Sequence, residues 1–103
     1  MERIGIFYRL KPGTQEEYKR RHDNIWPEMR TILSEAGIRN YSIWNYGEML
    51  FGYYETEDNE KTQRILNNSD VFIKWRKFME DIIVIDPETG EKEYFMKLMF
   101  YHE

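Results

Sequence analysis

The sequence predicts an α+β protein with the ferredoxin-like order βαββαβ, in which an antiparallel sheet carries helices on one face. Segments with period-two apolar alternation, typical of strands, occur at the start, the middle and the end of the chain. Segments with helical spacing fill the two intervals between them. The length of 103 residues fits a single domain, 1–103, with no internal linker or repeat.

The first strand and the first helix follow one another closely. Residues 3–10 (RIGIFYRL) alternate in the way expected of a strand, and Lys-Pro-Gly at 11–13 ends it. A helix is expected from Thr14, with Glu17 three residues later completing a capping box. This helix should run to about His22.

Pro27 leaves two alternatives for the next segment, because proline disfavours a helix interior and pushes Trp26 away from helical angles. The helix kinks there, or it ends and restarts with Pro27 in its first turn. A restarted helix would span 27–36 and end at Gly37 as a C-terminal cap. Its inward residues would be Met29, Ile32 and Leu33.

The remaining elements complete the order. Residues 38–46 and 49–55 alternate and are separated by a short turn, which predicts a β-hairpin. A short helix is expected over 58–66, and a second helix, capped by Ser69 or Asp70, over 71–83. Residues 93–101 are expected to form the last strand. The inward face of the final helix would carry Val71, Trp75, Phe78 and Ile82.

Such a sheet leaves one face without helices. In a chain this short, with 17% aromatic residues, a second copy is the expected cover. The sequence therefore predicts a homodimer that packs sheet on sheet.

Composition excludes several classes of function. The chain has no cysteine, which rules out disulfides, thiolate catalysis and cysteine-based metal sites. The net charge is −4, and the basic run at 19–21 is too short for a nucleic-acid footprint. No apolar run approaches the roughly 20 residues of a membrane span. The N-terminus is typical of a strand rather than a signal peptide, so a cytoplasmic protein is expected.

Two histidines are present, His22 and His102. His102 is penultimate and is expected at a frayed end. His22 follows Tyr18 by four residues, so both side chains lie on one helix face just before an irregular segment. An imidazole there is a candidate for proton transfer. The alternative is a surface histidine stabilised by the helix dipole, and spacing alone favours it.

Aromatic residues are candidates for contact with a polyol. Tyr18 and Tyr41 can both hydrogen-bond to it and stack on it, and the three tryptophans offer flat apolar faces. Each of them alone is more often a core residue. No carboxylate dyad, metal-ligand motif or glycine-rich phosphate loop is recognisable.

The segment YKRRHDNIWPEM at 18–29 resembles the L-rhamnose mutarotase family. The similarity extends to NYSI at 40–43, to WRKFM at 75–79 and to Phe-Tyr at 100–101, so it spans nearly the whole chain.

This resemblance implies a dimeric α/β-barrel that epimerises the anomeric carbon of L-rhamnose without a cofactor or a metal. It implies that His22 is the proton donor and that Tyr18, Tyr41 and Trp75 contact the sugar. Trp26 is a candidate pocket wall. Arg76 stands where the family often has a second tryptophan; its guanidinium can donate to hydroxyls but removes an aromatic wall.

Three alternatives remain open at this point. The chain is a non-catalytic sugar-binding or regulatory module of the same fold, which the altered wall at Arg76 favours. It is a mutarotase for another deoxyaldose. Or it is a haem- or quinone-directed monooxygenase with a related barrel, in which His22 would be an axial ligand; the 18–29 motif argues against this class.

Overall fold

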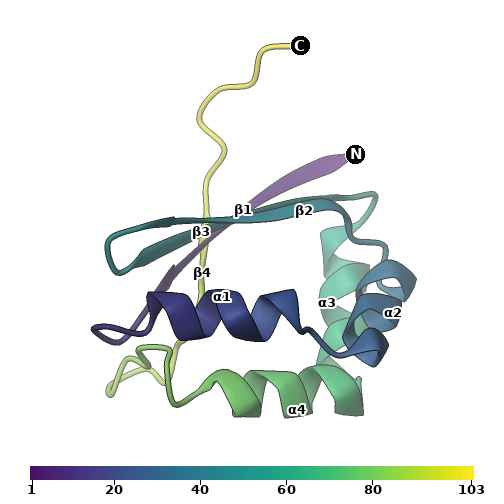
Figure 1. Cartoon of the computed structure of the whole chain (residues 1–103). Helices are drawn as coiled ribbons and strands as arrows, with labels where there is room; N and C mark the ends of the chain where they lie inside the picture. Colours follow the sequence, from purple (N-terminus) through teal and green to yellow (C-terminus); the bar gives the residue numbers. More distant parts are fainter.

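The computed structural model describes all 103 residues. The order along the chain is the predicted βαββαβ, with each helical interval divided into two helices (Figure 1). The elements are β1 (Glu2–Arg9), α1 (Gln15–Asp23), α2 (Pro27–Glu35), β2 (Arg39–Tyr46), β3 (Met49–Thr56), α3 (Asn59–Asn67), α4 (Asp70–Met79) and β4 (Tyr94–Met96).

The four strands form one antiparallel sheet in the order β2-β3-β1-β4. All four helices lie on one side of it (Figure 1). Strand β1 therefore lies between the last strand and the hairpin, as the ferredoxin-like arrangement requires. The predicted fold class is confirmed.

Pro27 restarts the helix rather than kinking it. Trp26 takes extended angles of φ −59° and ψ 135°, as expected of a residue before proline, and Pro27 opens α2. At the other end Gly37 has a φ of +88°, and the amide of Ile38 donates to the carbonyl of Leu33. This is the glycine-dependent C-terminal cap that the sequence predicts.

Two local predictions are wrong. Thr14 does not cap α1 with its side chain; its hydroxyl donates to the carbonyl of Lys11 at 2.7 Å. Glu17 cannot complete the capping box because two arginines of its own helix bind its carboxylate. Helix α4 is capped by Ser69 as expected but ends at Met79, before the predicted end at residue 83.

The last strand is much shorter than predicted. Of residues 93–101, only Tyr94–Met96 pair with β1. Residues 97–103 then extend away from the sheet, on the side opposite to the helices (Figure 1). Leu98, Met99 and Phe100 are exposed there.

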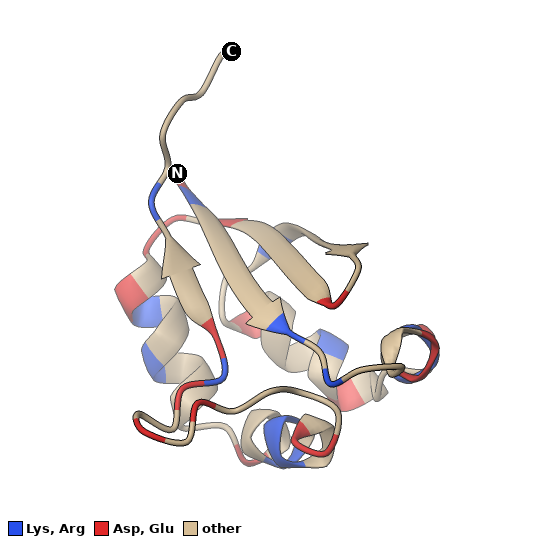
Figure 2. Ribbon diagram, turned by 90° about the vertical axis from the view of Figure 1, so that its left-hand side faces the viewer, with Lys and Arg blue, Asp and Glu red and all other residues tan.

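The two sheet faces differ in character. Towards the helices the sheet contributes Ile6, Leu10, Leu50 and Tyr54 to two buried clusters. The outer face exposes aromatic residues. The charged residues of the strands lie near the strand ends (Figure 2). None of the four helices has the length and hydropathy to cross a membrane.

Candidate active site

A cavity of about 700 Å³ lies between the inner face of the sheet, α1 and α4. A volume of this size accommodates a small polar ligand such as a monosaccharide. Its lining includes Tyr18, His22, Tyr41, Trp75 and Arg76. The structure thus brings together five of the six predicted site residues, although they come from three separate elements.

His22 ends up in this cavity because α1 continues one turn beyond Tyr18. The imidazole stacks on the Tyr18 ring at a centroid distance of 4.2 Å, and its Nδ1 lies 3.1 Å from the Tyr18 carbonyl oxygen. A carbonyl oxygen only accepts, so Nδ1 carries a hydrogen and donates it. Nε2 is therefore the ring nitrogen left free to exchange protons with a ligand.

Burial lowers the pKa of His22 below its ordinary value of 6.5; the Tyr18 carbonyl and the charge of Asp23 oppose this in part. The cause is that the cavity wall removes water that would solvate the imidazolium. At neutral pH the imidazole is mostly uncharged, and its protonated form is a stronger acid than an exposed histidine.

Trp75 is buried and forms the wall beside His22, with the two rings edge-to-face at 5.4 Å. Trp26 does not line the cavity. Its ring packs edge-to-face on Trp75 at 5.1 Å, which holds that ring in place from behind. Trp26 is thus a support for the wall rather than the wall itself.

A group of tyrosines supplies most of the polar surface inside the cavity. Tyr8 and Tyr41 come from neighbouring parts of the inner sheet face, and Tyr18 faces them from α1. Burial raises the pKa of each of these phenols, and each also feels at least one other phenol of the group. They stay protonated over the physiological range and can donate hydrogen bonds to a ligand.

Tyr41 reaches the cavity through an irregularity in β2. The register with β3 shifts between Arg39 and Ser42, and Asn40 adopts a φ of +53°. The side-chain amide of Asn40 donates to Glu55 at 2.8 Å. A bulge of this kind redirects the following side chain, and it turns Tyr41 towards Tyr54 on the inner face.

Arg76 is half-buried at the cavity and pairs with Glu93, whose Oε1 accepts from Nη1 at 3.2 Å. The carboxylate of Glu93 also lines the cavity. Its negative charge contributes to the raised pKa values of Tyr8 and Tyr41, in both cases as a smaller cause than burial. The cavity therefore combines a histidine, several phenols and the Arg76–Glu93 ion pair.

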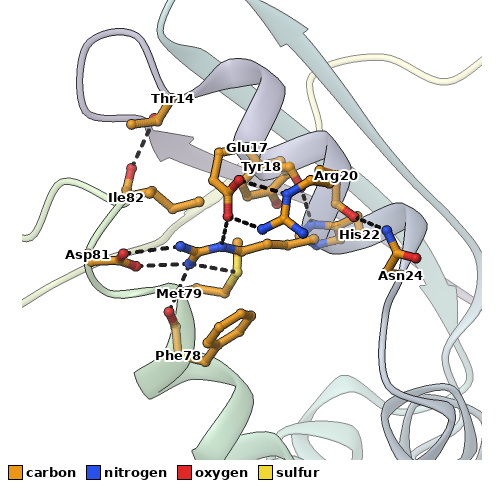
Figure 3. A network of polar contacts seen from close by, with 11 residues as sticks. Thr14, Glu17, Tyr18, Arg20, His22, Asn24, Phe78, Met79, Asp81 and Ile82 are labelled. Carbon is orange, nitrogen blue, oxygen red and sulfur yellow. Dashed lines mark hydrogen bonds and ion pairs between the residues drawn. The ribbon is translucent and has the colours of Figure 1, made fainter.

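The position of α1 depends on Arg21, which stands next to His22 but points away from the cavity. Its guanidinium donates to both carboxylate oxygens of Asp81, at 2.9 and 3.1 Å, and to Glu17 at 2.7 Å (Figure 3). It also donates to the carbonyl of Phe78. These bonds fasten α1 to the end of α4, the helix that carries Trp75.

Sequence reasoning missed Tyr8, Glu93 and Arg21. In the sequence, Tyr8 is one of the alternating residues of the first expected strand, and Glu93 is the first residue of the last expected strand. Arg21 is part of the short basic run at 19–21, directly before His22. No spacing rule connects these positions, because the fold brings them together from distant parts of the chain.

The family model for L-rhamnose mutarotase matches residues 3–102. An L-rhamnose mutarotase of Sinorhizobium fredii is 45% identical over 103 residues, which cover 98% of each chain. The crystal structure of L-rhamnose mutarotase FA22100 from Formosa agariphila aligns over 100% of both chains with a TM-score of 0.85 and 30% identity. Tetracenomycin F2 cyclase from Streptomyces glaucescens, at 13% identity and a TM-score of 0.64, shares the fold alone.

The fold and the cavity define a ferredoxin-like α+β protein with an enclosed site rich in tyrosine and built around one histidine. The matches over the full length place it more narrowly. The chain belongs to the L-rhamnose mutarotase family and is an isomerase.

Proposed function

We propose that this chain interconverts the α and β anomers of L-rhamnose, with His22 as the proton donor. The observation that carries the proposal is the fixed imidazole: Nδ1 is held by the Tyr18 carbonyl, which leaves Nε2 for the substrate. The names of the relatives supply the sugar.

The reaction needs two proton movements. The anomeric hydroxyl gives its proton to an acceptor while the bond between C1 and the ring oxygen breaks, and the ring oxygen takes a proton from the His22 imidazolium. The open aldehyde rotates about C1–C2. The same transfers then run in reverse and close the ring on the other face of C1, so the enzyme returns to its starting state.

The residues around His22 suit this chemistry. Tyr18, Tyr41 and Arg76 can donate to sugar hydroxyls and hold the ring in register. Trp75 offers an apolar surface to the C–H side of a sugar. Ring opening already occurs in water, so one positioned acid and good orientation provide the acceleration required.

Exchange NMR between the anomers of L-rhamnose tests the proposal, with L-fucose and other aldoses measured in parallel. His22→Ala should fold normally and lose about 100-fold or more of the saturable exchange rate. His102→Ala is the matched control, because it removes the other histidine, which is exposed near the chain end, and should exchange at the wild-type rate. Wild-type exchange in His22→Ala would show that the role of His22 is wrong.

The pH dependence follows from the lowered pKa of His22. If the imidazolium is the donor, kcat/KM should fall about tenfold per pH unit above that pKa, because the population of the acid falls by that factor. The fall should begin below pH 6.5, the ordinary value. A rate that keeps rising with pH above 6.5 would assign His22 as a base instead.

We also propose that two copies pack through their outer sheet faces. Trp44 and Tyr46 of β2 are 69% and 75% exposed on that face, and the exposed apolar segment 98–101 extends beyond it on the same side. Apolar surface of this extent is typical of an interface. Light scattering should give twice the chain mass of 12.8 kDa; the mass of one chain would contradict the proposal.

A further inference from the structure

The reaction proposed above requires a group that accepts the anomeric proton, and a carboxylate is the natural choice beside tyrosines whose raised pKa values keep them protonated. Four carboxylate residues line the cavity: Glu16, Asp23, Glu80 and Glu93.

Three of the four are poorly suited. Asp23 is exposed and bound by Lys19, whose Nζ lies 3.0 Å from its Oδ2. Glu16 is exposed on α1. Glu80 is bound by Lys92 at 2.8 Å, and its side chain is 39% exposed.

Glu93 differs in its burial and in its neighbours. Its side chain is 21% exposed, the least of the carboxylates with an ion-pair partner at the cavity. Arg76 binds only Oε1, so Oε2 has no partner within the chain. A fixed carboxylate with one free oxygen, facing a site of phenols, is poised to accept a hydrogen bond from a ligand hydroxyl.

We propose that Glu93, held in place by Arg76, is the catalytic residue that accepts the proton of the anomeric hydroxyl. The inference rests on the proposed mutarotase function and completes it. Arg76 is then a positioning residue for Glu93 as well as a donor to the sugar.

The protons balance with this pair of groups. In the opening half-reaction Glu93 gains the proton of O1 and His22 loses one to the ring oxygen, while the electron pair of the C1–O bond moves to that oxygen. In the closing half-reaction the ring hydroxyl attacks C1 and returns its proton to His22, and Glu93 gives its proton back to O1. No external reactant is consumed.

The pH profile should report both groups. Glu93 must be ionised and His22 protonated, so kcat/KM should fall on the acid side as Glu93 is protonated and on the alkaline side as His22 loses its proton. Titratable and charged groups line the cavity around the pair: Tyr8 from β1, Tyr41 from β2, Tyr54 from β3, Glu16, Tyr18, Lys19 and Asp23 from α1, Arg30 from α2, Arg76 and Glu80 at α4, and the neighbouring Lys92. The four phenols have raised pKa values and do not titrate in this range.

Glu93→Gln tests the inference, because it keeps the shape and a hydrogen-bond acceptor but removes the base. Its kcat for L-rhamnose exchange should fall about 100-fold or more with KM changed little, and the acid limb of the pH profile should disappear. Glu80→Gln is the matched control: it also removes a paired carboxylate from the cavity lining, and it should keep kcat within about twofold and retain the acid limb. Glu93→Asp, which retains a carboxylate, should recover part of kcat together with the acid limb.

The outcomes separate this inference from the function on which it rests. Loss of exchange in His22→Ala with full kcat and an unchanged acid limb in Glu93→Gln would overturn the role of Glu93 alone. A wild-type protein that exchanges no aldose would overturn both. If Glu93→Gln fails to fold by circular dichroism, Glu93→Asp decides the question, since an acid limb that keeps its wild-type position in that variant would contradict the inference.

Discussion

Consecutive residues of β3 serve opposite faces of the sheet. Leu50 points to the helices and is 2% exposed, whereas Phe51 points outward and is 36% exposed. Leu50 on the inner side belongs to the buried cluster that also contains Trp75, whereas the Phe51 ring on the outer side lies beside the Phe7 ring, with 5.5 Å between the ring centroids.

The contrast suggests different roles for the two sides of β3: the inner side stabilises the folded chain, and the outer side serves the proposed dimer contact. Residues on the inner face hold the sheet against α1 and α4 and so set the shape of the cavity. Residues on the outer face contribute little to the single chain, and their apolar surface is explained by the proposed contact with a second copy. Three substitutions at neighbouring positions test the separation.

Leu50→Ala should have the largest effect on stability. It removes a side chain that packs in the cluster between the sheet and the helices, and a buried leucine cut to alanine costs about 2–5 kcal/mol. Chemical denaturation measures this free energy. A loss of unfolding free energy below about 1 kcal/mol would contradict the close packing of Leu50 in this cluster.

Phe51→Ala should leave the single chain nearly as stable but weaken the dimer. Truncating a central aromatic residue of an interface commonly costs more than 1 kcal/mol of binding, so the dissociation constant should rise about tenfold. Sedimentation over a dilution series measures it. An unchanged constant, together with a dimeric wild type, would move the interface away from the outer face of β3.

The alternation that distinguishes Leu50 from Phe51 could be predicted from the sequence, because strand periodicity depends only on neighbouring residues. The same holds for the restart at Pro27 and the cap at Gly37. The capping box at Thr14 was wrong because Glu17 is bound by two arginines of its own helix, Arg20 and Arg21. Arg21 is also held from outside the helix, by Asp81 far along the chain.

The end of the chain shows the same limit. The apolar pattern of 93–101 predicted a long strand, yet β1 offers partners only opposite Tyr94–Met96.

At the site, family resemblance named Tyr18, His22, Tyr41, Trp75 and Arg76, all of which line the cavity. Neither resemblance nor spacing could reveal Glu93, because its relation to Arg76 exists only once the last segment folds back to α4.

Gly52→Ala tests the inner face more finely and should have the smallest effect. An added Cβ would meet Tyr41 Cε1 at 3.6 Å and Tyr8 Cε2 at 3.7 Å, which are ordinary contact distances, so the variant should fold. Alanine also loses less chain entropy than glycine in a strand, which favours the folded state by about 0.5 kcal/mol.

The new methyl group would lie in van der Waals contact with the two phenols that line the cavity above Gly52 and would limit how far they can shift towards the strand when the sugar binds. KM for L-rhamnose should therefore rise about threefold while kcat changes less, since the group lies under the binding surface rather than at His22. Gly5→Ala is the matched control. It adds the same methyl to the outer face of β1, where it would meet the flexible end of Met96 at 3.3 Å, and should leave KM unchanged. An equal rise of KM in Gly5→Ala and Gly52→Ala would contradict this separation, because a change on the outer face of the sheet would then affect sugar binding at the inner face.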